Sequence, residues 1–379
     1  MKKIITLILI LSIMILPKYV NAEELKDTAK ASVLLNVDTG KIIYEKDSHT
    51  KYKVASLTKM ALQIIVLEEI ESKNIKWTDI VTVSKNAADM GGSQIYLSEN
   101  EKMSVYDLFR GVTMASANDA AIALAEYIEG SEEKMTKRMN NLAKKLNLKD
   151  TVFKNVTGLD EDGASSSAYD IAKISEELLK HKKILEFSSM YEGYLRENTQ
   201  NKFWLVNTNK LIKMYPGTDG LKTGHTDEAG YCTSVTAKRN GERMLVVLLG
   251  EESINSRNKD AVFLLNYAFN NYKVKKIKAK SKPVKEIKVK NMNKNKIKIY
   301  LKKDANILFK NSERGKIKTK IKLNKIENLY KNKKVGKYYI YVNGKGKEKI
   351  DLIVKEKYYK LKLINIIKNN IENVILGKV

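Results

Sequence analysis

Cysteine and histidine, the residues that build disulfides and most metal sites, are scarce in this chain. Its 379 residues include one cysteine, Cys232, and three histidines. A single cysteine excludes an intrachain disulfide, so a packed hydrophobic core must hold the fold, and a chain of this length is able to bury one. No metal-ligand spacing is present, and we expect neither a metal nor another cofactor.

The N-terminus also lacks a hydrophobic run long enough to span a bilayer. The apolar run from Ile4 to Leu16 has 13 residues, whereas a spanning helix needs about 20. Two lysines precede this run, and a signal-peptidase site, Val20-Asn21-Ala22, follows it. These features predict a signal peptide at residues 1–22 and a mature chain that starts near Glu23. An uncleaved N-terminal anchor is the alternative, and in both cases the remainder is exported.

Acidic residues are scarce in the last third of the chain. From Lys273 onward there are 34 Lys and Arg residues against 8 Asp and Glu, so this segment carries the whole net charge of +26 and the rest is neutral. So abrupt a change indicates a domain boundary. A basic segment usually indicates a nucleic-acid partner, but export argues against nucleic acid. Anionic lipid headgroups or anionic cell-wall polymers are the polyanions available outside a cell.

Hydrophobic patterns predict an α+β fold for residues 23–272. Strand patterns stand at both ends of this region, and helical spacing of apolar residues fills the middle. We therefore expect an antiparallel sheet flanked by helices. The predicted strands cover 32–36, 42–44, 230–236 and 244–250; the predicted helices start at Ser56, Ser104, Asn118 and Ser131, and a last helix covers 257–272.

From Lys273 the pattern changes to short segments in which apolar residues alternate with lysines, as over 317–323. This alternation predicts a small, basic, β-rich domain over 273–355. The final segment, 356–379, carries isoleucines and a leucine at helical spacing, with lysines and asparagines largely off that stripe. Such a stripe predicts an amphipathic helix that lies in a membrane interface. A helix docked on the β-rich domain is the alternative.

Three short motifs carry the chemistry. They read SLTK from Ser56, SAN from Ser116 and KTG from Lys222, in that order. Each motif alone is weak, because S-x-x-K occurs four times in the chain and a lone serine or lysine is more often a helix cap or a solvated charge. Here the three motifs are spread over one predicted domain of strands and helices. In that combination they indicate an active-serine site that needs no catalytic histidine or aspartate.

Ser56 and Lys59 form the predicted reactive pair. A serine hydroxyl is a poor nucleophile until a base removes its proton. Lys59 lies one helical turn after Ser56 on the same face, but it is a base only if its pKa falls from about 10.4 towards neutrality. Burial and a nearby cation both lower a lysine pKa, and Lys222 is the natural second cation. Ser116 is predicted to relay protons between the lysines and the leaving amine.

The other motif residues are predicted to hold the substrate. Asn118 is expected to bind a substrate amide, and Lys222 and Thr223 a substrate carboxylate. Gly224 lets an edge strand approach the substrate backbone closely. The predicted oxyanion hole consists of the backbone N–H groups of Ser56 and His225.

Five longer segments contain or extend these motifs: VASLTKMAL (54–62), ASANDAAIALAEY (115–127), FKNVTGLDEDG (153–163), NTNKL (207–211) and DGLKTGHTDEAGYC (219–232). With them the chain resembles the low-molecular-mass penicillin-binding proteins that are serine-type D-alanyl-D-alanine carboxypeptidases. The resemblance covers essentially the whole chain. It departs at Ala117, where we expect glycine, and alanine is small enough to leave the site undisturbed.

The resemblance implies a β-lactamase/transpeptidase-like domain that removes the terminal D-alanine from peptidoglycan stem peptides through an acyl-serine intermediate. It implies that Ser56 is the nucleophile, that Lys59 is the general base, and that β-lactams such as penicillin acylate Ser56. It further implies a role in peptidoglycan biosynthesis and remodelling, and attachment of the C-terminal helix to the outer face of the cytoplasmic membrane.

Three other functions stay open from the sequence. A DD-endopeptidase cleaves the same kind of D-Ala–D-X bond. A class A β-lactamase deacylates with a glutamate, which we would expect in an E-x-x-L-N segment, and the segment Glu192 to Arg196 matches except for the asparagine. A non-catalytic surface protein that binds anionic polymers is the third. We also expect His49 and His181 at the surface without partners, and Asn155, Asn207 and Asn209 as structural caps and turn residues.

Overall fold

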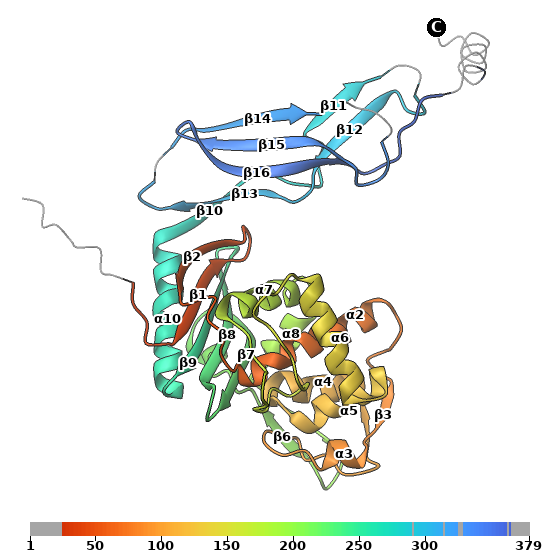
Figure 1. Ribbon diagram of the computed structural model, residues 1–379, viewed down its shortest axis with the longest axis vertical. Helices are drawn as coiled ribbons and strands as arrows, with labels where there is room; N and C mark the ends of the chain where they lie inside the picture. The colour runs from red at the N-terminus through yellow and green to blue at the C-terminus, as the bar shows by residue number, and fades with distance from the viewer. Residues whose placement is uncertain (1–24, 290–291, 314, 325–328, 362–363, 365–379) are drawn as a thin grey trace, which may run out of the picture.

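The computed structural model describes residues 25–289, 292–313, 315–324, 329–361 and 364 (Figure 1). The predicted signal peptide (1–22) and most of the predicted C-terminal helix (356–379) lie outside these residues. Residues 356–361 are not helical, because Tyr358 bridges Leu329 and Lys360 bridges Met292. Within the described ranges no helix is both long and apolar enough to cross a bilayer.

A five-stranded antiparallel sheet, ordered β2-β1-β9-β8-β7, forms the centre of the first part of the chain. The chain starts with β1 and β2, forms the helices, and returns to the sheet with the other three strands. Successive side chains of a strand point to opposite faces, so Val247 and Leu249 of β9 pack on one helical layer and Val246 and Leu248 on the other. The strands are β1 (Ala31–Asn36), β2 (Lys41–Lys46), β7 (Thr218–Thr226), β8 (Gly230–Arg239) and β9 (Glu242–Glu251).

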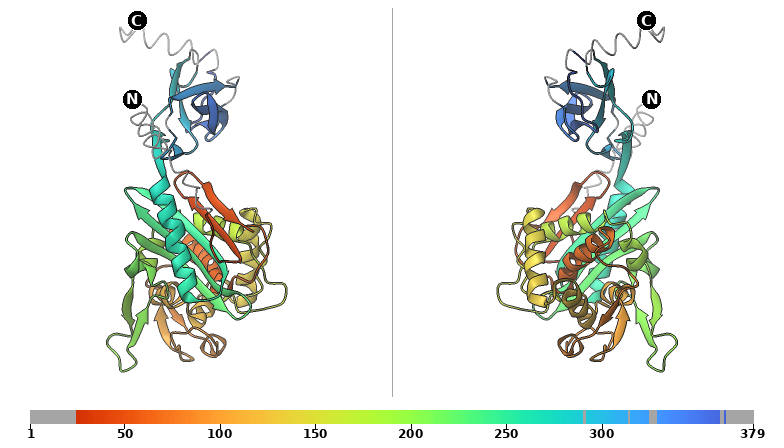
Figure 2. Two further views of the ribbon diagram at one scale, coloured as in Figure 1. Left: turned by 90° about the vertical axis from the view of Figure 1, so that its left-hand side faces the viewer. Right: turned by 90° about the vertical axis from the view of Figure 1, so that its right-hand side faces the viewer.

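Helices cover both faces of this sheet (Figure 2). Helix α10 (Ile254–Asn271) lies on one face, and α2 (Lys59–Glu71), α5 (Asn118–Glu129) and α7 (Ala168–Leu178) belong to the layer on the other. The remaining elements are η1 (Ala55–Thr58), β3 (Ile80–Thr82), α3 (Lys85–Ala88), β4 (Lys102–Ser104), α4 (Val105–Arg110), η2 (Gly111–Ala115), α6 (Glu132–Lys145), α8 (Ile184–Ser188), β5 (Glu192–Leu195), β6 (Phe203–Val206) and α9 (Leu211–Met214).

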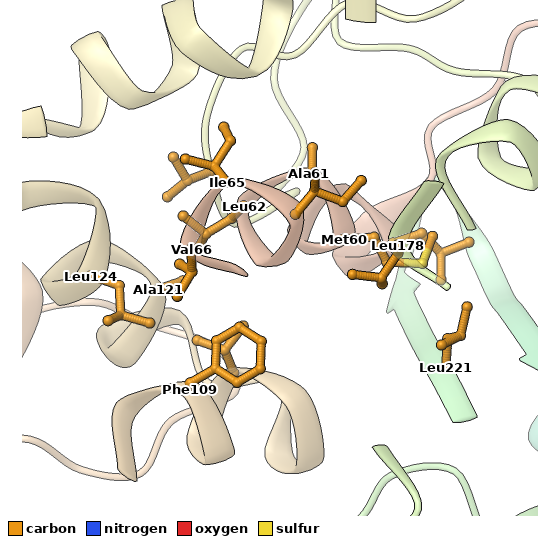
Figure 3. Close-up of a cluster of buried hydrophobic side chains, with 14 of the residues drawn as sticks. Met60, Ala61, Leu62, Ile65, Val66, Phe109, Ala121, Leu124, Leu178 and Leu221 are labelled. Carbon is orange, nitrogen blue, oxygen red and sulfur yellow. The ribbon is translucent and has the colours of Figure 1, made fainter. Parts of the chain in front are cut away.

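Helix α2 runs through the middle of the core. Its residues from Lys59 to Leu67 are all buried, because apolar side chains stand on every side of the helix rather than on one stripe. Met60, Leu62 and Val66 pack among side chains of the neighbouring helices (Figure 3). The first residue of this buried helix is Lys59, so the packing of α2 carries a lysine into the interior.

The second part of the chain is a small all-β domain that directly follows α10. One sheet has the order β11-β12-β16-β15-β14, and a two-stranded sheet, β10-β13, lies beside it. Ile299, Ile340 and Leu352 are among the residues that form a separate hydrophobic core. This arrangement confirms the predicted α+β fold with an all-β domain after it. The strands are β10 (Tyr272–Lys278), β11 (Lys285–Lys288), β12 (Lys296–Leu301), β13 (Ala305–Lys310), β14 (Ile317–Leu323), β15 (Lys334–Val342) and β16 (Lys345–Val354).

The two parts contact each other through polar groups. The Lys41 ammonium lies 3.3 Å from the Glu348 carboxylate, and the backbone N–H of Val274 donates to Glu242 Oε1 at 2.7 Å. One surface expectation was wrong: His181 is buried, and its Nδ1 lies 2.8 Å from Glu71 Oε1. His49 is exposed but lies 3.4 Å from Asp150.

Candidate active site

Ser56 lies in the 3-10 turn η1, which leads directly into α2. The residue before it, Ala55, has a φ of +47°, a left-handed conformation that costs free energy in a residue with a Cβ and is often found next to functional groups. The turn is held from outside by Gly158, where a Cβ would come within 2.0 Å of the Ala55 carbonyl oxygen. This packing fixes the position of the Ser56 hydroxyl at the start of the helix.

Lys59 is fully buried and lies beside Ser56. Its Nζ is 2.9 Å from Ser56 Oγ and donates to the backbone carbonyl of Thr157 at 2.6 Å. Burial holds the pKa of Lys59 well below its usual value, and the charge of Lys222 lowers it further, while Asp119 partly opposes this. A lysine in this setting readily loses its proton, so its nitrogen is able to accept one from the serine.

Lys222 projects from β7, the strand at one edge of the sheet, and is 1% exposed. Its Nζ donates to the Thr223 carbonyl at 2.8 Å. Burial and, to a smaller extent, the charge of Arg257 lower the pKa of Lys222 to about 7. The charge of Lys222 thus acts on the pKa of Lys59, in the direction that the sequence analysis expected for a second cation.

Ser116 and Asn118 approach the site from the turn between η2 and α5. Ser116 has a left-handed φ of +64°, and its buried Oγ has no hydrogen-bond partner in the part of the chain that the structure describes. Asn118 Nδ2 donates to the Gly91 carbonyl at 2.7 Å, and its backbone N–H donates to the Ser93 carbonyl at 2.6 Å. An unsatisfied buried hydroxyl is unusual, and here it is available to a bound substrate.

Thr223, Gly224 and His225 form the edge of β7 that faces Ser56. A Cβ on Gly224 would lie 2.8 Å from the Ser56 nitrogen, so only glycine lets the strand come this close. Thr223 Oγ1 donates to Thr208 Oγ1 at 2.7 Å. The His225 ring stacks on Tyr231 with 4.0 Å between the centroids, and both residues line the cavity above Ser56.

A cavity of about 410 Å³ opens over these groups. Ser56, Ser116, Thr223, Gly224 and His225 line it, and Lys59, Asn118 and Lys222 lie buried beneath. All eight predicted site residues therefore meet at one place. No cluster of three or more His, Cys, Asp or Glu side chains that would suit a metal occurs among the described residues.

The profile of the peptidase family described as D-alanyl-D-alanine carboxypeptidase matches residues 18–253. The chain belongs to this family. A second profile, the C-terminal domain of penicillin-binding protein 5, matches residues 272–360.

Individual relatives agree with this assignment to the carboxypeptidase family. D-alanyl-D-alanine carboxypeptidase DacF of Bacillus subtilis is 44% identical over 301 residues, which are 79% of this chain and 77% of that protein. Penicillin-binding protein 5 of Haemophilus influenzae superposes with a TM-score of 0.78 at 28% identity, over 88% of this chain and 98% of that one. Penicillin-binding protein D2 of Listeria monocytogenes, solved in its ampicillin-bound form, superposes with a TM-score of 0.58 at 33% identity. The superposition covers 64% of this chain and 98% of that one.

Arg257 is a carboxypeptidase-site residue that the motifs did not reveal. It is 4% exposed, lines the cavity, and contacts Asn258 Oδ1 through Nε and Nη2 at 3.2 and 3.0 Å. Burial lowers its pKa, yet a guanidinium keeps its charge. It therefore adds a fixed cation beside Lys222. Nothing in the sequence around Arg257 marks it, since the residue belongs to the helix that closes the fold.

Asn155 is a second residue with a larger part than expected. Its Oδ1 accepts from the Gly158 N–H at 2.7 Å and from Thr157 Oγ1 at 3.1 Å, and its Nδ2 donates to the Leu159 carbonyl at 3.1 Å. These bonds shape the turn that contains Thr157, whose carbonyl holds Lys59. Asn155 is a turn residue, as predicted, and the turn that it shapes positions the base.

Proposed function

We propose that this protein is a serine-type D-Ala-D-Ala carboxypeptidase that removes the terminal D-alanine from peptidoglycan stem peptides through an acyl-serine intermediate. The observation that carries the proposal is the 2.9 Å contact between Ser56 Oγ and the buried Nζ of Lys59. The relatives named D-alanyl-D-alanine carboxypeptidase support the same reaction.

In the acylation step Ser56 is the nucleophile. Neutral Lys59 takes the proton as Ser56 Oγ attacks the carbonyl carbon of the penultimate D-alanine, and the backbone N–H groups of Ser56 and His225 bind the developing oxyanion. The C–N bond then breaks. The proton passes through the Ser116 hydroxyl to the amine of the departing D-alanine, which leaves a serine ester on the shortened peptide.

The departing D-alanine carries a carboxylate, and the cations Lys222 and Arg257 beside the cavity are suited to bind it. Lys222, Thr223 and Arg257 are the proposed carboxylate-binding groups, because they combine charge with a hydroxyl donor in a buried setting. Asn118 is proposed to bind the amide of the preceding residue. A substrate that ends in an amide instead of a carboxylate would lose these contacts.

Hydrolysis of the serine ester regenerates the enzyme. A water molecule gives its proton to Lys59 and attacks the ester carbonyl, after which Ser56 Oγ recovers a proton. A β-lactam enters by the same acylation step, because its strained amide occupies the place of the peptide bond. The ampicillin-bound Listeria relative supports penicillin binding, and we expect the adduct on Ser56.

The location of the enzyme follows from the terminal segments. We propose that residues 1–22 direct export, that 23–272 and 273–355 are the catalytic and basic β-rich domains, and that the segment after them attaches the protein to the outer face of the cytoplasmic membrane. The charge distribution and the apolar stripe of the tail support this arrangement. Substrate there would be peptidoglycan, not nucleic acid.

Labelling with fluorescent penicillin tests the proposal, combined with release of D-alanine from an acyl-D-alanyl-D-alanine peptide. We expect a stable adduct on Ser56 and peptide turnover, with both lost in the Ser56→Ala variant. Folded protein that releases no D-alanine would contradict the proposal. Release of penicilloate within seconds would point to a β-lactamase, and cleavage of cross-linked dimers in preference to terminal D-alanine would point to a DD-endopeptidase.

A further inference from the structure

The large sheet of the β domain has one buried face and one exposed face. Ile340 of β15 and Leu352 of β16 point into the domain core, and the residues that alternate with such core residues along each strand point outward. The outward-facing residues, which are exposed or half-buried, are mostly lysines and tyrosines. We call this surface the lysine–tyrosine face, and it consists of Lys318, Lys320 and Lys322 on β14, Lys337, Tyr339 and Tyr341 on β15, Lys349 on β16, and Lys298 and Tyr300 on β12.

The strand register arranges these side chains in rows across the sheet, whose strands β14, β15 and β16 lie side by side (Figure 1). Lys320 stands opposite Tyr339, which stands opposite Lys349. One row away, Lys318 stands opposite Tyr341. Directly opposite residues of antiparallel strands share a face, so each row presents ammonium groups beside an aromatic ring.

Like charges face each other in the third row. Lys322 stands opposite Lys337, and Lys337 opposite Asp351. The Asp351 carboxylate is taken by Lys334 at 2.8 Å. Among the described residues, Lys318, Lys320 and Lys322 have no carboxylate partner. Opposed lysines destabilise a sheet. Because these lysines lack carboxylate partners, this face keeps positive charge that the domain itself does not neutralise.

The tyrosines give the face a second chemical character. The rings of Tyr339 and Tyr341 lie 6.4 Å apart at an interplanar angle of 23°, and the Lys355 ammonium lies over the Tyr300 ring at 4.3 Å. Rings that lie between ammonium groups suit a ligand in which negative charges alternate with polyol or sugar units. The lysines of β14 recur at every second residue, or about 7 Å along the strand, which suits a linear ligand.

We propose that the lysine–tyrosine face binds a phosphodiester polymer built from polyol or sugar units, and so holds the enzyme at an anionic layer of the cell envelope. The inference rests on the proposed location outside the cytoplasm. A lipid surface fits less well, because interfacial binding also needs apolar side chains that insert between lipids, and Ile353 on this side of the sheet is only 9% exposed.

Binding of the full-length chain to lipid-free poly(glycerol phosphate) tests the inference. The Lys318→Gln/Lys320→Gln/Lys322→Gln variant is expected to bind at least about tenfold more weakly. The matched control, Lys137→Gln/Lys144→Gln/Lys149→Gln, removes the same charge from exposed lysines on and after α6 and is expected to bind like the wild type. Tyr339→Ala should weaken binding severalfold, and raising the salt concentration should weaken it further.

Four outcomes would overturn the inference. They are equal weakening in both lysine variants, equally tight binding of polyglutamate, no effect of Tyr339→Ala, and binding to phosphatidylglycerol vesicles without binding to the lipid-free polymer. The Ser56→Ala variant separates this inference from the proposed reaction. It should release no D-alanine but should bind the polymer with wild-type affinity, because the two properties depend on different parts of the chain.

Discussion

Lys59 and Lys222 lie under the active-site cavity with 0% and 1% of their surface exposed, whereas Lys318 and Lys320 on β14 are exposed to solvent. Burial penalises the charged form and lowers the pKa of both buried lysines, that of Lys222 to about 7. Water solvates the charged ammonium groups of the other two, which therefore stay protonated and contribute positive charge to the surface. The comparison teaches that the packing around a lysine, not the residue type, decides whether it does chemistry or supplies charge.

The largest effect should come from removing the buried base. Lys59→Ala is expected to lower kcat/KM for D-alanine release by about 10²–10⁴-fold, the scale on which positioned general bases contribute. The exposed Lys51→Ala variant should stay within about twofold of wild type, because solvated surface positions seldom matter. Initial rates with an acyl-D-alanyl-D-alanine peptide measure both, and circular dichroism checks folding. A Lys59→Ala rate near that of wild type would mean that another group is the base.

The second effect is on stability and depends on pH. Lys222 has a pKa of about 7 in the folded protein against 10.5 for an ordinary lysine. Between these values the unfolded chain holds a proton that the folded chain lacks, so the free energy of unfolding rises with pH, by up to about 1.4 kcal/mol per pH unit for this group. Below about pH 7 both states are protonated and the slope ends.

In the Lys222→Met variant the free energy of unfolding should therefore rise less between about pH 7.5 and 9.5 than in the wild type. In the Lys320→Met variant it should rise as in the wild type. Urea unfolding followed by tryptophan fluorescence reports on the domain that contains Lys222, since Trp77 and Trp204 both belong to that domain. Identical slopes for Lys222→Met and the wild type would show that Lys222 stays charged when folded.

The sequence predicts the reactive pair well because it is local. Ser56 and Lys59 are one turn apart, and one helical turn alone brings their side chains to 2.9 Å. Arg257 was missed because its place depends on how α10 packs across the sheet, which no spacing within that helix encodes. His181 was predicted at the surface because no partner for it is evident in the sequence, yet it packs against Glu71 at the end of α2.

The β domain shows the same limit. Strand β14 alternates strictly and was predicted at its observed bounds, 317–323. Strand β16 was not identified, because Ile350 to Val354 is nearly continuously apolar and has no clear period of two. The alternation of apolar residues with lysines predicts a lysine-rich face, but the rows of lysine and tyrosine across the strands depend on strand register and could not be predicted.

A smaller effect should come from the turn that holds the base. Asn155→Ala removes the bonds that shape the Thr157 turn, and a small displacement of Lys59 is expected to lower kcat about tenfold with little change in KM. Asn74→Ala is the matched control. Asn74 donates to Glu69 at 2.7 Å, as Asn155 donates to Glu161 at 3.0 Å, but Asn74 lies beyond the end of α2 opposite Lys59. A change in KM alone would show that the turn contacts substrate rather than positioning Lys59.

The smallest effect belongs to the exposed lysines. Lys322→Gln should raise the melting temperature of the β domain by roughly 1 °C or less at low salt, because it relieves the repulsion between Lys322 and the facing Lys337. Lys320 faces Tyr339 instead of a lysine, so the Lys320→Gln variant should have an unchanged melting temperature. Added salt screens the repulsion and should remove the gain, as differential scanning calorimetry at two salt concentrations would show. A loss of stability in Lys322→Gln would mean that this lysine is held by contacts within the domain, and its charge would then not be available to an external polyanion.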